Sequence, residues 1–369
     1  MQLVNQTPAP ATVDVSLGED DAGPRIGMLV AKVTFNILAG GRTEVETQDP
    51  IPLFGTEEPT DLGPLPSDGV QRRDSRFEVI MLGAAYTPHG RLANSCTVGL
   101  QVGEVAHSMV VTGDRAWARS GKTTQISRPA PFHRMPLTYA NAHGGSCDTN
   151  IDLDTVVELR DRLNPHGKGF DAEAQAIAIA AGFKAPQGFP HLDYTRLLPN
   201  LEHPEQRITR WEDAPEPYCW ATVPQDTAFS QIRMLRRMDL LGKLGRTPEQ
   251  DEHPPTTEQG IEQLYHRAHP DWIIDLPGPQ TLVTMTGLTP EGRLAFHLPP
   301  VRVLADYTLG ERRGCRELAP QVLVLLPEER RGYLVYRSAF TVETQPGVEQ
   351  SFRLRLDRGW FQYPEPQKQ

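Results

Sequence analysis

Proline and glycine constrain the fold of this chain more than any other feature of its sequence. The 369 residues include 34 prolines and 31 glycines, whereas average proline usage is only about 5%. Proline lacks a backbone N–H and clashes with the preceding helical turn, so it is poorly tolerated inside helices. Glycine permits the backbone angles of tight turns. The two residue types together predict many short elements joined by turns, which favours strands over long helices.

The rest of the composition is typical of a folded soluble protein. Hydrophobic residues make up 38% of the chain and charged residues 23%, whereas disordered chains combine low hydrophobicity with high net charge. A chain of this length can bury two cores or one large elongated core. The net charge of −10 argues against binding to duplexes, because neutralising phosphates requires a basic face. We therefore expect no nucleic-acid partner.

Targeting signals and cysteine spacing bear on the compartment of the protein. The sequence has no run of about 18 apolar residues, and Met1–Ser16 lacks the basic start and apolar stretch of a signal peptide. The cysteines Cys96, Cys147, Cys219 and Cys315 lie far apart without a CxxC pair, which fits neither a disulfide framework nor a zinc finger. We expect a cytoplasmic protein with reduced thiols and no membrane insertion.

Alternating apolar and polar residues predict strands near the N-terminus. Val33–Ile37 alternates in this way, and the apolar stretch Met28–Ala31 leads into it. Further strands are expected over Phe77–Tyr86, Val98–Val102 and Ser108–Val111. Thr87–Arg91 is interpreted as a hairpin tip, because proline presets one turn position and glycine allows positive φ. We predict an N-terminal β lobe over residues 1–135.

Strand patterns return near the C-terminus. The continuous apolar run Val322–Leu326 is typical of a strand buried on both faces. Leu294–Leu298 and Phe352–Leu356 alternate, and Tyr333–Val342 follows the polar turn after the buried run. We predict a second β region over residues 271–369, packed with the first.

The middle of the chain, residues 136–270, has a different texture. We predict an irregular connecting region with short helices over Asp171–Ala181 and Thr227–Leu241, each followed by glycine. Residues 242–258 have almost no apolar content and are expected to form an exposed loop. The fold class is therefore mainly β, with two β-sandwich- or barrel-like lobes and a few short helices and long loops between them.

Three constellations suggest chemistry, but each has a simpler structural explanation. His133, His143 and Cys147 offer nitrogen and sulfur ligands, yet their spacing matches no zinc motif. Cys147 or Ser146 follows two glycines as a nucleophile would, but a nucleophile needs a base and oxyanion donors at fixed geometry. Asn164–Gly169 lacks the GxxxxGK[ST] pattern of a phosphate loop. We predict no catalytic, cofactor-binding or metal site, and no cofactor.

Several stretches resemble a known family in sequence and in order. Pro136–Gly145 reads PLTYANAHGG, Asn164–Phe170 reads NPHGKGF and Leu198–Glu202 reads LPNLE. They are similar to the MPLxYExAFGG, NPxGxGF and LPNIE stretches of DUF2169 proteins. Weaker matches are Thr112–Trp117, Thr289–Phe296 and Leu334–Arg337. His143 departs from the family, which often has an aromatic residue there, and residues 216–222 replace an expected GFGP stretch.

The resemblance points to motif positions that set the shape of the chain. These family-motif residues, interpreted as structural, are Gly144, Gly145, Asn164, Pro165, Gly167, Gly169, Phe170, Pro199 and Asn200. Glycine, proline and asparagine at such positions favour tight turns and close backbone approach.

The resemblance also implies a function. DUF2169 proteins resemble one another as cytoplasmic adaptors or chaperones of the type VI secretion system. They accompany an effector, often with a PAAR-type tip domain, to the spike. The expected partner is thus a protein, and the oligomeric state stays open. Such an adaptor should present an exposed apolar patch or an open sheet edge.

Two alternatives to the adaptor hypothesis remain open from the residues alone. The first is a hydrolase-like enzyme that uses His143 and Cys147, whose side chains would have to converge in a concave pocket. The second is a structural component of the secretion apparatus.

Overall fold

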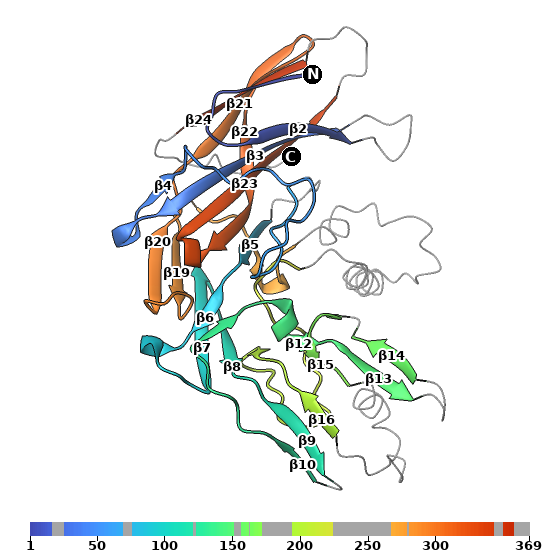
Figure 1. Cartoon of the computed structure of the whole chain (residues 1–369). Helices are drawn as coiled ribbons and strands as arrows, with labels where there is room; N and C mark the ends of the chain where they lie inside the picture. Colours follow the sequence, from blue (N-terminus) through green and yellow to red (C-terminus); the bar gives the residue numbers. More distant parts are fainter. Residues whose placement is uncertain are drawn as a thin grey trace.

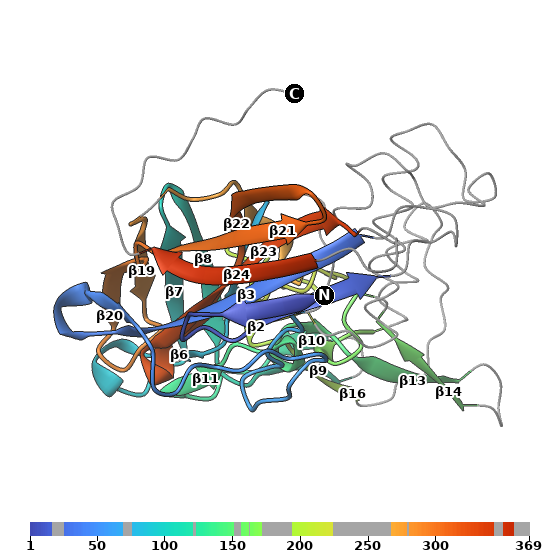
Figure 2. The same ribbon diagram turned by 90° about the horizontal axis from the view of Figure 1, so that it is seen from above.

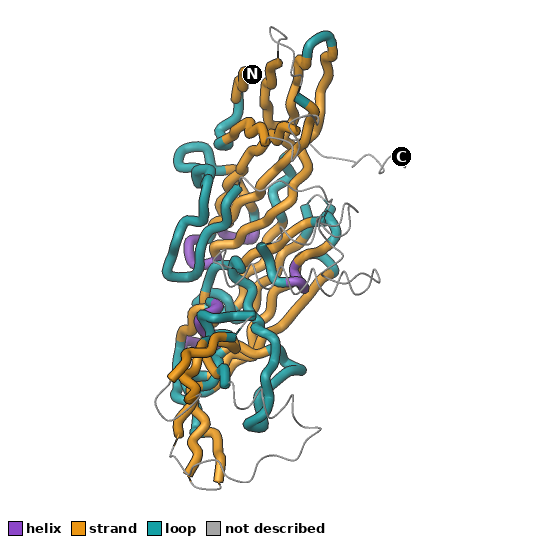
Figure 3. Tube along the Cα trace, turned by 90° about the vertical axis from the view of Figure 1, so that its right-hand side faces the viewer, coloured by secondary structure: helices purple, strands orange, loops and turns teal. Residues whose placement is uncertain are grey.

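The computed structural model confirms a mainly β protein (Figures 1 and 3). It describes residues 1–16, 26–68, 76–120, 123–150, 156–161, 163–171, 194–223, 267–278, 280–342 and 350–357. The predicted helix Thr227–Leu241 and the predicted loop 242–258 lie outside the described residues, as does the predicted helix Asp171–Ala181 apart from Asp171. Within the described residues, no helix is long and apolar enough to cross a lipid bilayer.

The largest sheet has ten strands. They are β1 (Gln2–Asn5), β2 (Ala11–Ser16), β3 (Ile26–Ile37), β4 (Thr43–Val45), β5 (Phe77–Met81), β18 (Ile273–Ile274), β21 (Arg302–Leu309), β22 (Arg312–Leu326), β23 (Arg331–Thr341) and β24 (Gln350–Asp357). The main path runs β1-β24-β21-β22-β23-β3-β2, with β4 added to β3, β5 to β22 and β18 to β5. The strands predicted over Val33–Ile37, Val322–Leu326, Tyr333–Val342 and Phe352–Leu356 all belong to this sheet.

The large sheet curls into a nearly closed, barrel-like shape (Figures 1 and 2). Its two end strands, β1 and β2, are consecutive in the sequence, so the short connection Gln6–Pro10 spans the opening. The Gln6 N–H donates to the carbonyl of Leu354 in β24, and the Pro10 carbonyl accepts from the N–H of Lys32 in β3. One connection therefore ties both ends of the sheet together.

Strand β22 lies in the middle of the large sheet. Its C-terminal half pairs antiparallel with β23 and parallel with β5, and Val322, Leu323, Val324 and Leu325 are buried. The strand is enclosed on both faces, as the uninterrupted apolar run predicts.

A five-stranded sheet packs against the large one. Its strands, in the order β17-β8-β7-β19-β20, are β17 (Leu201–Glu202), β8 (Val105–Thr112), β7 (Ser95–Val102), β19 (Leu282–Thr286) and β20 (Arg293–His297). Phe35 of β3 meets Phe296 of β20 with ring centroids 6.1 Å apart, and one hydrophobic core spans both sheets. Strands from residues 1–135 and 271–369 pair within both sheets, so the sheets are not divided between these two ranges.

Short ribbons and single helical turns complete the described chain (Figure 1). The ribbon strands are β6 (Ala84–Tyr86), β9 (Ala116–Ser120), β10 (Thr123–Ile126), β11 (Arg134–Pro136), β12 (His143–Gly144), β13 (Ser146–Asn150), β14 (Val156–Arg160), β15 (Lys168–Gly169) and β16 (Tyr194–Leu197). The 3₁₀ turns are η1 (Ala39–Gly41), η2 (Pro88–Gly90), η3 (Tyr139–Asn141), η6 (Pro270–Trp272) and η7 (Pro327–Glu329).

The hairpin predicted around Thr87–Arg91 is wrong. A turn, η2, does occupy this position, but β6 before it pairs with β11 rather than with β7 after it. Strand β7 already has β8 on one edge and β19 on the other. The residues that follow the turn pair with other segments, Ala93 with Phe132 and Ser95–Val102 with β8, so η2 does not close a hairpin.

Charged groups are buried under the face of the large sheet that carries Lys32. The Lys32 Nζ lies 2.6 Å from Asp68 Oδ2 and donates to the Pro52 carbonyl. It also sits over the rings of Phe54 and Tyr333, at 4.2 and 4.5 Å from their centroids. Burial lowers the pKa of Lys32 and raises the pKa of Asp68, while their mutual attraction opposes both shifts. The pair offsets the cost of removing each charge from water.

Breaking this pair should destabilise the fold strongly. We expect Asp68→Asn to lower the free energy of unfolding by about 3–5 kcal/mol, because it leaves the buried Lys32 ammonium without its counter-ion. Glu291→Gln is the matched control, since Glu291 forms an exposed ion pair with Arg330 and exposed pairs contribute about 0–1 kcal/mol. Urea unfolding curves measure both changes. Equal effects of the two substitutions would contradict the importance of the buried pair.

Candidate functional site

The nine family-motif residues predicted from the sequence come together in one place, beside the small parallel ribbon of β12 and β15 (Figure 1). We call this the motif cluster, and its members are Gly144, Gly145, Asn164, Pro165, Gly167, Gly169, Phe170, Pro199 and Asn200. They come from three segments that are separate in the sequence. The ribbon joins the first two segments, and a contact between Gly169 and Pro199 brings in the third.

Asn164 links the first two segments of the motif cluster. Its side chain is fully buried, and its Nδ2 donates to the carbonyls of Tyr139 and His143 at 2.7 and 2.9 Å. Its own carbonyl accepts from the Gly145 N–H at 2.7 Å. Gly144 has φ +137°, and a Cβ there would lie 2.0 Å from the Asn164 carbonyl oxygen. Only glycine allows the two backbones to approach this closely.

Asn200 links the third segment to the five-stranded sheet. Its Nδ2 donates to the Thr112 carbonyl at the end of β8 and to Asp114 Oδ1, at 2.9 and 3.0 Å. Its Oδ1 accepts from Lys168 Nζ at 2.7 Å. The Asn200 N–H donates to the Asn141 carbonyl. Through its side-chain amide and its backbone N–H, Asn200 therefore connects the motif stretches around Thr112, Asn141 and Lys168.

A buried ion pair lies next to Asn200, and sequence reasoning missed it. The Glu202 carboxylate lies 2.6 Å from Arg115 NH2 and 2.8 Å from Arg207 Nε, and it accepts from the Ile208 N–H. Glu202 and Arg115 are both buried. The available signal was position, because Arg115 and Glu202 stand inside the TGDRAW and LPNLE stretches. Charged residues are usually exposed, so a charged residue inside a motif is informative.

His143 is buried beside the motif cluster. Burial and the nearby positive charge of Arg196 lower its pKa to about 4, although a hydrogen bond with the backbone of Pro215 opposes the shift. The imidazole is therefore neutral at pH 7, and its Nδ1 has no hydrogen-bond partner among the described residues. Cys147 is half-buried in the β13–β14 ribbon, opposite Leu159. His133 is exposed.

In the described structure, neither the histidine–cysteine group nor the Asn164–Gly169 loop has the geometry of a ligand site. Among the described residues, His, Cys, Asp and Glu side chains nowhere gather in a group of three or more suited to a metal, and His133, His143 and Cys147 are all described. In the Asn164–Gly169 loop, the Gly167 N–H donates to the Asn164 carbonyl and the Lys168 N–H to the Ala142 carbonyl. Those N–H groups bind the chain itself, whereas a phosphate loop would turn them toward a ligand.

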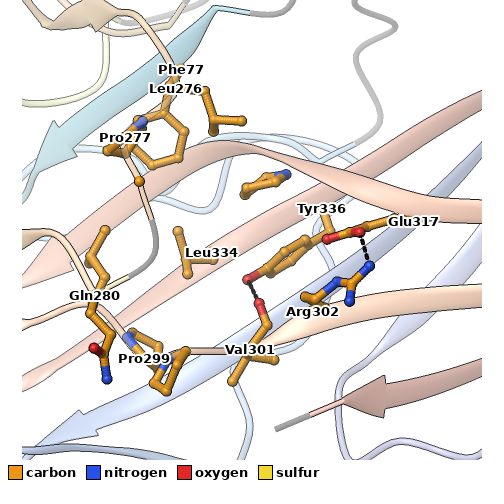
Figure 4. A pocket seen from close by; sticks show the side chains of 14 residues that line it. Phe77, Leu276, Pro277, Gln280, Pro299, Val301, Arg302, Glu317, Leu334 and Tyr336 are labelled. Atoms are coloured by element: carbon orange, nitrogen blue, oxygen red, sulfur yellow. Dashed lines mark hydrogen bonds and ion pairs between the residues drawn. The ribbon is translucent and has the colours of Figure 1, made fainter. Parts of the chain in front are cut away.

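Two hollows differ sharply in volume. The first is a proline-lined groove at the junction of the two large sheets (Figure 4). Tyr336 donates there to the Val301 carbonyl at 2.9 Å, and Arg302 pairs with Glu317. Its volume is about 40 Å³, roughly that of one water molecule in the liquid, about 30 Å³. Ligand pockets usually measure about 300–1,000 Å³, so this groove is much smaller than an ordinary ligand pocket.

The second hollow lies where β22 and β23 separate, and we call it the β22–β23 cleft. Its volume is about 330 Å³, within the ligand range of about 300–1,000 Å³. Its lining residues are Leu29, Ala305, Tyr307, Leu309, Arg312, Arg316, Ser338, Ala339, Phe340 and Phe352. They belong to β3, β21, β22, β23 and β24, so the cleft opens into the inner face of the curled sheet.

Proline and a bulge explain why the two strands separate. The ladder between β22 and β23 is irregular between Pro320 and Val322 and ends at the pair Ala319–Arg337. Pro320 has no N–H to donate, and a bulge bends its strand. Beyond that point, among the strands that the structure describes, residues 312–318 pair only with β21, and residues 338–341 pair only with β3. Each of these half-strands therefore has one edge facing the cleft.

A family model described as an uncharacterized protein conserved in bacteria (DUF2169) matches residues 22–337. No curated protein and no solved structure matches the chain.

Substitution of a motif glycine should destabilise the protein more than substitution of a turn glycine. We expect Gly144→Ala to lower the free energy of unfolding by about 3 kcal/mol or more, from backbone strain and the clash with Asn164. Gly90→Ala is the control, because Gly90 has φ +63° but open space around it; its cost should be about 1–2 kcal/mol. Chemical denaturation distinguishes the two. A smaller loss for Gly144→Ala would refute the tight packing.

His143 should make stability depend on pH. Its folded pKa of about 4 lies below its ordinary value of 6.5, so between these values the unfolded chain binds a proton that the folded chain does not. The unfolding free energy should therefore fall by up to about 3 kcal/mol as pH drops from 6.5 to 4. His143→Phe should flatten the curve over this window. Thermal unfolding at several pH values tests this, and parallel curves for the two proteins would contradict it.

Proposed function

This chain belongs to the DUF2169 family, and we propose that it is a non-enzymatic adaptor or chaperone for a type VI secretion effector. In this proposal it binds the effector in the cytoplasm and helps to load it onto the PAAR-type tip of the spike. The partner is a protein rather than a small molecule, a nucleic acid or a membrane. The motifs shared with DUF2169 proteins are the reason for proposing the type VI secretion system. The open strand edges of the large sheet support a role in binding another protein.

The observation that carries the proposal is the opened ladder between β22 and β23. Two half-strands, residues 312–318 and 338–341, each have one backbone edge that pairs with no other described strand. Free strand edges are templates for pairing with another chain, and proteins use them to bind extended peptides by strand addition. A polypeptide can match such edges along its whole length, which favours a protein partner.

The motif cluster supports the same proposal in a different way. Its glycines and asparagines hold backbone segments together through buried hydrogen bonds, such as those of Asn164 and Asn200. Within the described residues, the side-chain N–H groups of both asparagines thus bind the chain itself, whereas Asn164 Oδ1 has no hydrogen-bond partner. This is the arrangement expected of a rigid scaffold, which lowers the entropy lost when a partner docks.

Co-expression with the effector encoded by the neighbouring gene tests the proposal. We expect the effector to co-purify with this protein and to lose most of its solubility and secretion when the protein is deleted. An unrelated effector of the same apparatus is the control and should be unaffected. Equal solubility and secretion without this chain would refute the adaptor role.

The competing functions give different outcomes in the same strains. A hydrolase built on His143 and Cys147 would turn over a substrate and lose that turnover in Cys147→Ser. A structural component would co-purify with sheath or baseplate proteins in stoichiometric amounts. Either result would replace the adaptor proposal.

A further inference from the structure

We propose that the β22–β23 cleft binds one extended segment of the partner protein, in which a carboxylate side chain faces Arg316 and apolar side chains lie on an aromatic floor. This inference rests on the proposed adaptor function and assigns its contact site. Three features of the cleft carry it: two strand edges, a preformed apolar floor, and positive charge.

The strand edges set the conformation and length of the bound segment. In the described part of the chain, residues 312–318 on one side pair only with β21, and residues 338–341 on the other side pair only with β3. Across this opening, the guanidinium of Arg316 donates to the Ala339 carbonyl at 2.5 Å. A long side chain thus reaches across to an oxygen that a neighbouring strand would otherwise bind. An extended segment about as long as the shorter edge, residues 338–341, fits between the two strand edges.

The floor of the cleft is aromatic and already assembled. The rings of Phe340 and Phe352 lie with centroids 4.6 Å apart. Phe340 packs on Gly27, where an added Cβ would lie 2.3 Å from its ring, and Tyr307 packs on Gly314, where an added Cβ would lie 2.7 Å from its hydroxyl. These glycines give the rings room to lie flat along the sheet. Apolar side chains at alternate positions of a bound strand would cover this floor.

The charge of the cleft selects an acidic segment. Among the residues that the structure describes, its lining includes Arg312 and Arg316 but no Asp or Glu, although the whole chain carries a net charge of −10. Arg316 lies on β22 at the edge of the opening and currently binds a neutral carbonyl. A carboxylate is the stronger acceptor for a guanidinium and can engage it through two parallel hydrogen bonds. We therefore assign to the partner a short strand that combines a carboxylate with apolar residues.

Site-specific crosslinking in the co-expressed complex locates the bound segment. A photo-crosslinking amino acid replaces Ser338 inside the cleft, and in a control replaces Arg353, an exposed residue on the outer side of β24. We expect crosslinks from position 338 to one short effector segment that contains Asp or Glu, and few from position 353. Crosslinks to a second copy of this chain, or to a segment without a carboxylate, would overturn the proposal.

Charge reversal then tests the carboxylate. The crosslinked segment is made as a labelled synthetic peptide, and its affinity is measured by fluorescence anisotropy. We expect Arg316→Glu to weaken binding at least tenfold, and Arg353→Glu, which changes the net charge equally, to weaken it less than twofold. A peptide with its carboxylate changed to lysine should bind Arg316→Glu better than it binds the wild type. Melting temperatures confirm that both variants are folded.

The outcomes separate this inference from the proposed function. If the effector co-purifies equally well with wild type and Arg316→Glu, and position 338 gives no crosslinks to it, the cleft is not the contact site while the adaptor role stands. If the effector does not co-purify with the wild-type protein at all, the adaptor role itself fails, and this assignment fails with it.

Discussion

The rest of the structure depends on the way β22 changes its partners along its length. Its first half pairs with β21, and its second half lies between β23 and β5. The change occurs between Leu318 and Ala319, next to Pro320 and the adjoining bulge. Proline cannot donate to the ladder, and a bulge bends its strand. The β22–β23 cleft opens at this irregularity, where β22 and β23 stop pairing.

A second constraint is that both halves of the chain build the same core. Phe35 from the N-terminal part packs on Phe296 from the C-terminal part, and β7 pairs with β19 across nearly two hundred residues. Buried charges are paired within this framework: Lys32 with Asp68 under the large sheet, and Glu202 with Arg115 beside the motif cluster. Such pairs fix a geometry rather than add much net stability, since the cost of removing charges from water offsets much of their attraction.

The proposed function follows from the contrast between the two sites. In the motif cluster, the side-chain N–H groups of Asn164 and Asn200 already bind neighbouring chain segments, which suits a scaffold. In the cleft, strand edges, aromatic rings and guanidinium groups are arranged around a volume of about 330 Å³. The residues that the motifs emphasise and the residues proposed to contact a partner are thus different. A shared scaffold can then present a contact surface suited to one partner.

The sequence by itself determined the strand content, the positions of most strands in the two large sheets, and the tight-turn character of motif residues such as Gly144 and Asn164. These follow from side-chain alternation and from backbone freedom, which are local properties of the chain. Only the tertiary structure decided which strands pair, that β6 joins β11 instead of β7, that Lys32 and Glu202 are buried, and that β22 parts from β23. Pairing and burial depend on contacts between residues far apart in the sequence. Their free energies are set by packing and desolvation in the assembled core, which no local pattern records.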